Sequence, residues 1–133
     1  MKNITLRTGR RCELVDITGE VQRAVQECGL EEGLAIVFVG HTTAGLTINE
    51  NADPSVVADL LAILERLVPE RGGYRHSEGN SDAHCKASLM GSSVNVAVQG
   101  GRLVLGTWQG IYFCEFDGPR QRKFQVLTVP GVR

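Results

Sequence analysis

The pattern of apolar and polar positions at the start of the chain predicts two strands followed by a helix. Residues 4–8 and 11–18 both alternate with period two, as half-buried strands do, and the glycine between them suggests a hairpin. The spacing then changes, because apolar residues recur every three or four positions until a glycine ends the pattern. We therefore expect a helix over residues 18–28.

The middle of the chain carries the clearest helix. Asp53 is a typical N-cap, Pro54 fits the first helical position, and Pro69 ends the segment. The polar, glycine-rich sequence that follows has no periodicity, and residues 82–90 then predict a short helix. Five apolar residues at helical spacing form a stripe along the long helix: Val57, Leu60, Leu61, Leu64 and Leu67.

The remaining apolar runs predict strands and set the fold class. Residues 34–40 are a continuous apolar run, typical of a buried strand, and residues 45–49 suggest a short one. This order of elements predicts an α+β fold: one domain over residues 1–133, with a large antiparallel sheet or sandwich, one long helix and one or two short helices. An antiparallel meander with glycine-containing turns is expected over residues 93–99, 102–108, 110–116 and 121–129.

Composition narrows the classes of function. The chain has 133 residues, of which 42% are hydrophobic, enough for a sizeable core. Its net charge of −1 argues against a nucleic-acid-binding surface. No apolar run approaches the ~20 residues of a membrane span, and the N-terminus lacks the apolar core of a signal peptide. We expect a cytoplasmic protein that binds neither nucleic acid nor membrane, with its four cysteines reduced.

The three histidines, His41, His76 and His84, all lie in polar, glycine-bearing segments rather than in apolar stripes. Three neutral imidazoles with an open fourth position suit Zn²⁺ or a similar divalent ion. Neighbouring carboxylates would orient the imidazoles or complete the shell of a harder ion such as Mg²⁺. The candidate carboxylates are Glu50, Glu78 and Asp82. The alternative is that one or more of the histidines is an ordinary loop residue.

Residues near the histidines also suggest anion binding or nucleophilic chemistry. Lys86, beside several hydroxyls and a predicted helix start, is suited to hold an anion, and Arg120 lies on a turn. Arg122 and Lys123 are better interpreted as a solvated hairpin tip. Cys85 is a rival nucleophile, because His⁺, lysine and a helix N-terminus favour a thiolate, although adjacent helical residues point in different directions.

The segment at residues 106–110 contains the only tryptophan. Two glycines within a strand pattern suggest a bulge or a close approach of the backbone. Trp108 and Gln109 would then line a pocket, by stacking and by amide hydrogen bonds. The other interpretation is that Trp108 is a core residue beside a tight bend, and the sequence leaves both open.

Three stretches together resemble the YjbQ-like family, whose members have been described as secondary thiamine-phosphate synthases. They are HTTAGLTINENADPSVVADL, YRHSEG with DAHCKASLMGSS, and GRLVLGTWQGIYFCEFDGPR. The likeness runs from about Leu14 to the C-terminus. The positions that match the family's pattern are His41, Thr42, Thr43, Asn49, Glu50, Asn51, His76, Glu78, Gly79, His84, Lys86, Gly106, Thr107, Trp108 and Gln109.

The resemblance implies a homotrimer with a polar cleft that holds a divalent metal ion (Zn²⁺ or Mg²⁺) and a phosphorylated small molecule. It implies a transferase that joins hydroxymethylpyrimidine diphosphate to a thiazole phosphate and releases pyrophosphate. Two other classes stay open: a metal-dependent hydrolase of a small phosphate or ester, and a non-enzymatic trimer that binds a metabolite or a metal. The expected metal ligands are His41, His76 and His84; these three, Glu50 and Lys86 are the expected catalytic residues; and the expected substrate-binding residues are Thr42, Thr43, Asn49, Glu78, Lys86, Trp108, Gln109 and Arg120.

Overall fold

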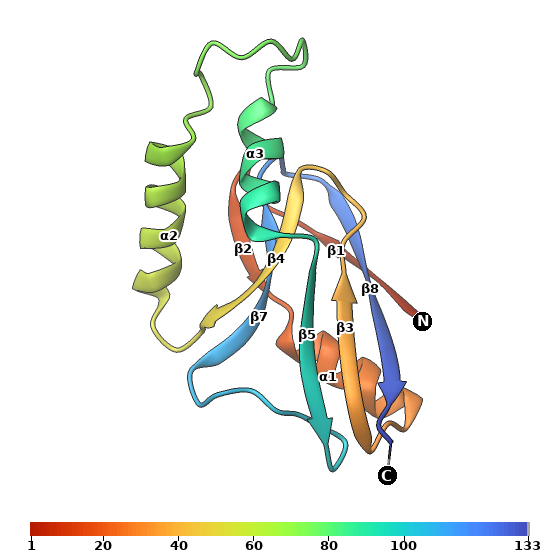
Figure 1. The fold of residues 1–133 in the computed structure, drawn as a ribbon. Coiled ribbons are helices and arrows are strands. Elements are labelled where there is room, and N and C mark those ends of the chain that lie inside the picture. Colours follow the sequence, from red (N-terminus) through yellow and green to blue (C-terminus); the bar gives the residue numbers. More distant parts are fainter. Residues whose placement is uncertain (133) are drawn as a thin grey trace.

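The computed structural model describes residues 1–132, which form eight strands and three helices (Figure 1). Helix α2 begins as its sequence predicts, because the Asp53 carboxylate accepts a hydrogen bond from the Ser55 N–H at 2.9 Å. The elements, in chain order, are β1 (Lys2–Arg7), β2 (Glu13–Asp16), α1 (Thr18–Cys28), β3 (Glu32–Phe38), β4 (Ala44–Glu50), α2 (Pro54–Leu67), α3 (Ser81–Met90), β5 (Ser93–Gln99), β6 (Arg102–Leu103), β7 (Gln109–Glu115) and β8 (Gln121–Pro130).

The strands form two antiparallel sheets, which confirms the α+β class. One sheet has the order β1-β8-β3-β5-β6, and the other has the order β2-β7-β4. The expected hairpin between residues 4–8 and 11–18 is wrong, because β1 pairs with β8 and β2 pairs with β7. The chain leaves one sheet at Thr8, whose N–H donates to the Arg120 carbonyl, and then enters the other.

The expected meander over the late strands is also wrong. Strand β5 pairs with β3 and only briefly with β6, whereas β7 lies in the other sheet and β8 between β1 and β3. The segment expected as a strand over residues 102–108 leaves the sheet after Leu103. A turn forms there instead, in which the Gln109 N–H donates to the Gly106 carbonyl and the Gly106 N–H to the Gln109 side chain.

The main core lies between the two sheets and α1. Because residues alternate along a strand, β7 buries Ile111 and Phe113 in this core and turns Tyr112 and Cys114 to the other side. On that other side, α2 and α3 cover the three-stranded sheet (Figure 1). The main core comprises Ile17, Val21, Ala24, Val37, Val39, Ala44, Leu46, Val96, Ile111, Phe113, Phe124 and Val126.

Helix α2 packs more loosely than its apolar stripe suggests. Of the five stripe residues, only Leu64 is buried, and Leu67 is 69% exposed. The outward face of the five-stranded sheet also carries apolar side chains. Phe38, Leu127 and Val129 are each more than 40% exposed there, and β3 places Ile36 opposite Leu127.

The structure also shows the state of the cysteines and the length of the helices. Cys12, Cys28, Cys85 and Cys114 are all free thiols. Cys28 is exposed, whereas Cys114 is buried. No helix within residues 1–132 has the length and apolar character needed to cross a membrane.

Candidate functional site: a histidine and arginine cavity

A polar cavity of about 460 Å³ opens where β3, β4, β7 and β8 meet the start of α3. Three regions that are far apart in the chain supply its walls: the loop after β3, the loop before α3 together with α3, and the turn between β7 and β8 together with the start of β8. The structure thus brings all three histidines to one place. The lining residues are Gly40, His41, Thr42, Thr43, His76, Glu78, Asn80, His84, Asp117, Arg120 and Arg122.

Two of the histidines, His76 and His84, lie against each other. Their ring centroids are 5.4 Å apart, and the rings are nearly perpendicular, at 86°. The His76 Nε2 atom lies 3.8 Å from a carboxylate oxygen of Glu78, so an ion pair forms when this ring is protonated. His76 and Glu78 come from the loop before α3, and His84 comes from the first turns of that helix.

His41 is held differently, by the backbone of β8. Its Nε2 atom accepts a hydrogen bond from the Lys123 N–H at 3.1 Å. Partial burial, and then the charge of Arg122, lower the pKa of His41 below its ordinary value of 6.5. His41 is therefore neutral at pH 7, with its proton on Nδ1, because Nε2 uses its lone pair as an acceptor.

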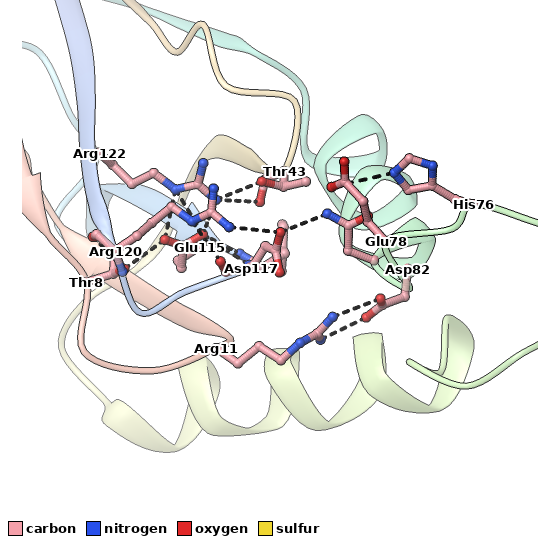
Figure 2. A network of polar contacts seen from close by, with 12 residues as sticks. Thr8, Arg11, Thr43, His76, Glu78, Asp82, Glu115, Asp117, Arg120 and Arg122 are labelled. Atoms are coloured by element: carbon pink, nitrogen blue, oxygen red, sulfur yellow. Dashed lines mark hydrogen bonds and ion pairs between the residues drawn. The ribbon is translucent and has the colours of Figure 1, made fainter. Parts of the chain in front are cut away.

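Arg122 forms the floor of the cavity, and its side chain is 2% exposed. Its Nε donates to Glu115 at 2.9 Å, and its Nη2 donates to the Thr43 hydroxyl at 2.8 Å. Within residues 1–132 its Nη1 has no hydrogen-bond partner, and Figure 2 shows this nitrogen turned away from both Glu115 and Thr43. One face of the guanidinium is thus fixed by protein and another is free.

Glu115 is the buried counter-ion that holds Arg122 in place. The Thr8 hydroxyl donates to this carboxylate at 2.7 Å, and the N–H groups of Phe116 and Asp117 donate to it at 3.1 Å each. Burial alone would raise the pKa of Glu115, but the hydrogen bonds from Arg122 and Thr8 outweigh burial and hold this pKa below 4.5. The carboxylate is therefore ionised and pairs permanently with Arg122 at neutral pH.

The interpretation of Arg122 as part of a solvated hairpin tip is wrong. The sequence Arg-Gln-Arg-Lys reads as a surface turn, yet β8 starts at Gln121 and turns every second residue inward. Arg122 is thus inward with Phe124 and Val126, while Lys123 is exposed as expected. The available signal was this alternation, combined with a glutamate at the inward end of the preceding strand.

Arg120 completes the basic side of the cavity from the rim. Its Nε donates to the Asp117 carbonyl at 3.0 Å, and its Nη2 donates to the Asp117 carboxylate at 3.2 Å (Figure 2). Asn80 donates to the same carboxylate at 2.9 Å. The Oδ1 atom of Asn80 is buried without a hydrogen-bond partner among residues 1–132, so this wall has an unused acceptor as well as free donors.

Lys86, expected as an anion-binding residue, does not line the cavity. It is 1% exposed, and its Nζ atom lies 2.8 Å from Glu65 and 3.2 Å from Asp82. Asp82 also accepts two hydrogen bonds from Arg11 at 3.0 Å each, a pair that Figure 2 shows apart from the Arg122 group. Lys86 therefore joins α3 to α2. Cys85, the rival nucleophile, is exposed and also lies outside the cavity lining.

Four other expected site residues lie at the opposite end of the three-stranded sheet. The β4–β7 register pairs Glu50 with Gln109 at one end and Ala44 with Glu115 at the other. Six residues of strand separate the two ends, or about 20 Å. Within one chain, therefore, the structure does not bring Asn49, Glu50, Trp108 and Gln109 to the histidines. Trp108 is 63% exposed, so it is not a core residue.

As arranged, the three histidines do not form a three-histidine metal centre. His41 uses Nε2 to accept the Lys123 N–H, so this atom has no lone pair left for a metal ion. Within residues 1–132, no three His, Cys, Asp or Glu side chains are grouped as metal ligands. A divalent ion stays a prediction, with His76 and His84 as the histidines whose nitrogens are available for it.

The chain is closely similar to known proteins over nearly its whole length. Residues 2–131 match the model of the family described as UPF0047 protein YjbQ-like. The UPF0047 protein YugU of Bacillus subtilis is 53% identical over 123 residues, covering 92% of this chain and 93% of that protein. The UPF0047 protein MJ1081 of Methanocaldococcus jannaschii is 52% identical over 124 residues, covering 93% and 90%. A Clostridium acetobutylicum crystal structure superposes with a TM-score of 0.96 at 53% identity, covering 97% of this chain and 100% of that one.

Proposed function

Because the chain belongs to the UPF0047 protein YjbQ-like family, we propose that it is a transferase acting on phosphorylated small molecules in the histidine and arginine cavity. The proposed reaction is that of a secondary thiamine-phosphate synthase. It joins hydroxymethylpyrimidine diphosphate to a thiazole phosphate and releases pyrophosphate. The family resemblance suggests the reaction, and the charged residues that line the cavity support it.

The observation that carries the proposal is the free face of Arg122. A buried guanidinium that is fixed by Glu115 and keeps one nitrogen towards a cavity is a preorganised anion donor. Neutral His41 keeps an N–H at Nδ1, and Thr42 adds a hydroxyl to the same lining. Carboxylates behind Arg122 and Arg120 aim the two guanidinium groups without occupying all of their N–H donors.

These residues would act on the leaving group. In the reaction, the carbon–oxygen bond of the hydroxymethyl group breaks, and its electron pair leaves with the pyrophosphate. The thiazole nitrogen supplies the pair for the new carbon–nitrogen bond, so no general base is required. Arg122 and Arg120 would neutralise the charge that develops on the departing oxygen, which lowers the barrier to bond breaking. No step in this scheme uses a metal ion.

The proposal includes a homotrimer, which the outward face of the five-stranded sheet supports. Apolar side chains from β3 and β8 gather there, with Ile36 opposite Leu127 and Leu34 opposite Val129. A contiguous apolar area on a sheet face favours association. Phe38 lies at the end of β3, beside the residues that line the cavity. Association through this face would place the cavity near a subunit boundary.

Product analysis tests the function. The purified protein is incubated with both phosphorylated substrates, with and without added Mg²⁺ or Zn²⁺, and the products are separated by chromatography. Thiamine phosphate and pyrophosphate in equal amounts support the transferase. Release of phosphate from a single substrate would instead indicate a hydrolase. Binding of the substrates without any product would favour a non-enzymatic metabolite-binding protein.

A further inference from the structure

A second hollow, of about 610 Å³, lies beside the first cavity. The two share part of their lining, because Gly40, His41, Thr42 and His84 face both. These shared residues show that the two spaces lie side by side. The second hollow is lined by Phe38, Val39, Gly40, His41, Thr42, Ala44, His84, Ala87, Ser88, Gly91 and Ser92.

The two spaces differ in the charged residues that line them. Arg120, Arg122, Glu78 and Asp117 all line the first cavity. Among residues 1–132, no Lys, Arg, Asp or Glu lines the second hollow, which instead has an aromatic ring, several aliphatic side chains and two serines. The first space is thus suited to a charged group and the second to an uncharged one.

Phe38 is the main apolar surface of the second hollow. It is the last residue of β3 and remains 46% exposed, although its neighbours Val37 and Val39 are buried in the core. The backbone beside it is fixed, because the Val39 N–H donates to the Ser92 carbonyl at 2.9 Å. A ring held at the mouth of a hollow offers a flat face for stacking.

We propose that the two spaces form one bipartite site, in which the second hollow holds the aromatic ring of a substrate whose phosphate lies in the first cavity. The phosphate binds Arg122 and Arg120 in the first cavity. The ring lies in the second hollow against Phe38, and the linking atoms pass His41 and His84. This inference rests on the anion-binding role in the proposed function and adds to it the place where the ring of the phosphorylated substrate lies.

Isothermal titration calorimetry with two probes tests this arrangement. Inorganic phosphate reports on the first cavity alone, and phenyl phosphate reports on both. We expect the wild-type protein to bind phenyl phosphate about tenfold more tightly than inorganic phosphate, because the ring adds apolar burial and stacking. Phe38→Ala should reduce this ratio to about threefold or less and leave the affinity for inorganic phosphate unchanged.

A second variant fills the hollow instead of emptying it. Ser88 is exposed on α3, so Ser88→Phe should fold normally and block the ring while inorganic phosphate still binds. The matched control is Leu67→Ala on α2, which removes an exposed apolar side chain from outside both spaces and should retain the tenfold ratio. Light scattering of each variant shows whether its assembly state has changed.

The outcomes separate the inference from the proposed function. If wild-type protein binds both probes equally, or if both variants keep the tenfold ratio, the bipartite site is wrong while the anion site stands. If neither probe binds, the anion site and everything that rests on it are wrong. Loss of inorganic phosphate binding in Phe38→Ala or Ser88→Phe would also overturn the inference, because it would show that the phosphate and the ring are not bound in separate spaces.

Discussion

Arg122 and Lys86 are both cations, both almost fully buried and both paired with carboxylates, yet only Arg122 lines the cavity. The difference lies in what surrounds each charged group. Lys86 has Glu65 and Asp82 on its ammonium group, and it connects two helices. Arg122 keeps one nitrogen free of the partners that hold the other two. We therefore expect that mutating either residue destabilises the protein but that only mutation of Arg122 weakens phosphate binding.

Arg122→Met should abolish phosphate binding and also destabilise the protein. Without the guanidinium, Glu115 becomes a buried carboxylate without its counter-ion, which typically costs about 3–5 kcal/mol. The double variant Glu115→Leu with Arg122→Met removes both charges and should recover much of that stability without recovering binding. Urea unfolding and calorimetry with inorganic phosphate measure the two effects. Full phosphate affinity in a folded Arg122→Met protein would disprove the role of this residue.

Lys86→Met should destabilise the protein but leave phosphate affinity unchanged. Burial alone would lower the pKa of Lys86, but its hydrogen bonds to Glu65 and Asp82 raise this pKa above its ordinary value, so the group is charged. Its removal deprives buried Asp82 of one donor, although Arg11 remains, so we expect a loss of about 1–3 kcal/mol. The same two measurements apply. Weaker phosphate binding at unchanged stability would restore the sequence-based expectation.

Glu115 should make the protein sensitive to acid. Its pKa is lower in the folded state than the ordinary value of 4.5, so the carboxylate contributes stability above pH 4.5, and this contribution is lost as pH falls through the lowered pKa. Glu115→Gln should be less stable at pH 7 but should lose less further stability on acidification. Urea unfolding between pH 7 and pH 3 tests this, with the exposed Glu31→Gln as control. Parallel pH profiles for all three proteins would contradict it.

Only part of the candidate site could be predicted from the sequence. The three histidines lay in polar segments that match a family pattern, Arg120 lay on a predicted turn, and the structure does bring these four residues together. The burial of Arg122 was missed because it depends on Glu115, across a turn from it in another strand. The expectation that Lys86 binds an anion in the cavity was wrong, because helix periodicity does not show which face of α3 meets α2. The positions of Arg122 and Lys86 both depend on contacts between segments that are far apart in the chain.

At the scale of elements, α3 reaches the cavity because it packs unusually close to β4. Gly45 lies at this contact, and a Cβ atom there would be 2.9 Å from the Gly91 carbonyl and 2.9 Å from Met90 Cβ. No side chain other than hydrogen fits without movement. Since α3 carries His84 and the loop before β4 carries His41, this contact sets the distance between the two histidines.

Gly45→Ala should therefore push α3 away from β4. Overpacking of this kind typically costs about 1–3 kcal/mol. Because Ala87 and Gly91 line the second hollow, phenyl phosphate should bind more weakly than to wild type. Gly19→Ala is the matched control, because a Cβ atom there meets nothing within 4 Å, and it should be neutral or stabilising by up to about 1 kcal/mol. Unchanged stability and affinity in Gly45→Ala would show that the close contact between α3 and β4 determines neither property.

Most elements were predictable from sequence, but their pairing was not. Helix α1 and strand β5 have the expected bounds, because glycines and changes of periodicity mark their ends. Alternation along β1 and β2 specifies which residues face inward but not which strand lies alongside. The hairpin and the meander were both inferred from neighbours in the chain, whereas β8 pairs with β1 and β3, which precede it by many residues.

At the scale of the whole molecule, the outward sheet face predicts the assembly. Leu127→Glu places a charge among apolar side chains that we expect to meet a second copy, so it should dissociate the proposed trimer into monomers. Leu89→Glu, at an exposed position on α3, is the control and should leave the assembly intact. Light scattering at micromolar concentration measures the mass. A wild-type mass that stays at the 14.4 kDa of one chain on raising the concentration would rule out the trimer.

The place of β8 in the sheet has a consequence for synthesis on the ribosome. This strand follows all the other elements in the chain, yet it lies between β1 and β3. Until β8 leaves the exit tunnel, the edges of β1 and β3 that it will pair with stay open, and open edges invite association with other chains. A nascent chain halted at that stage has all three histidines but neither Arg120 nor Arg122. Completion of the proposed anion site and protection of these sheet edges therefore both depend on the emergence of β8.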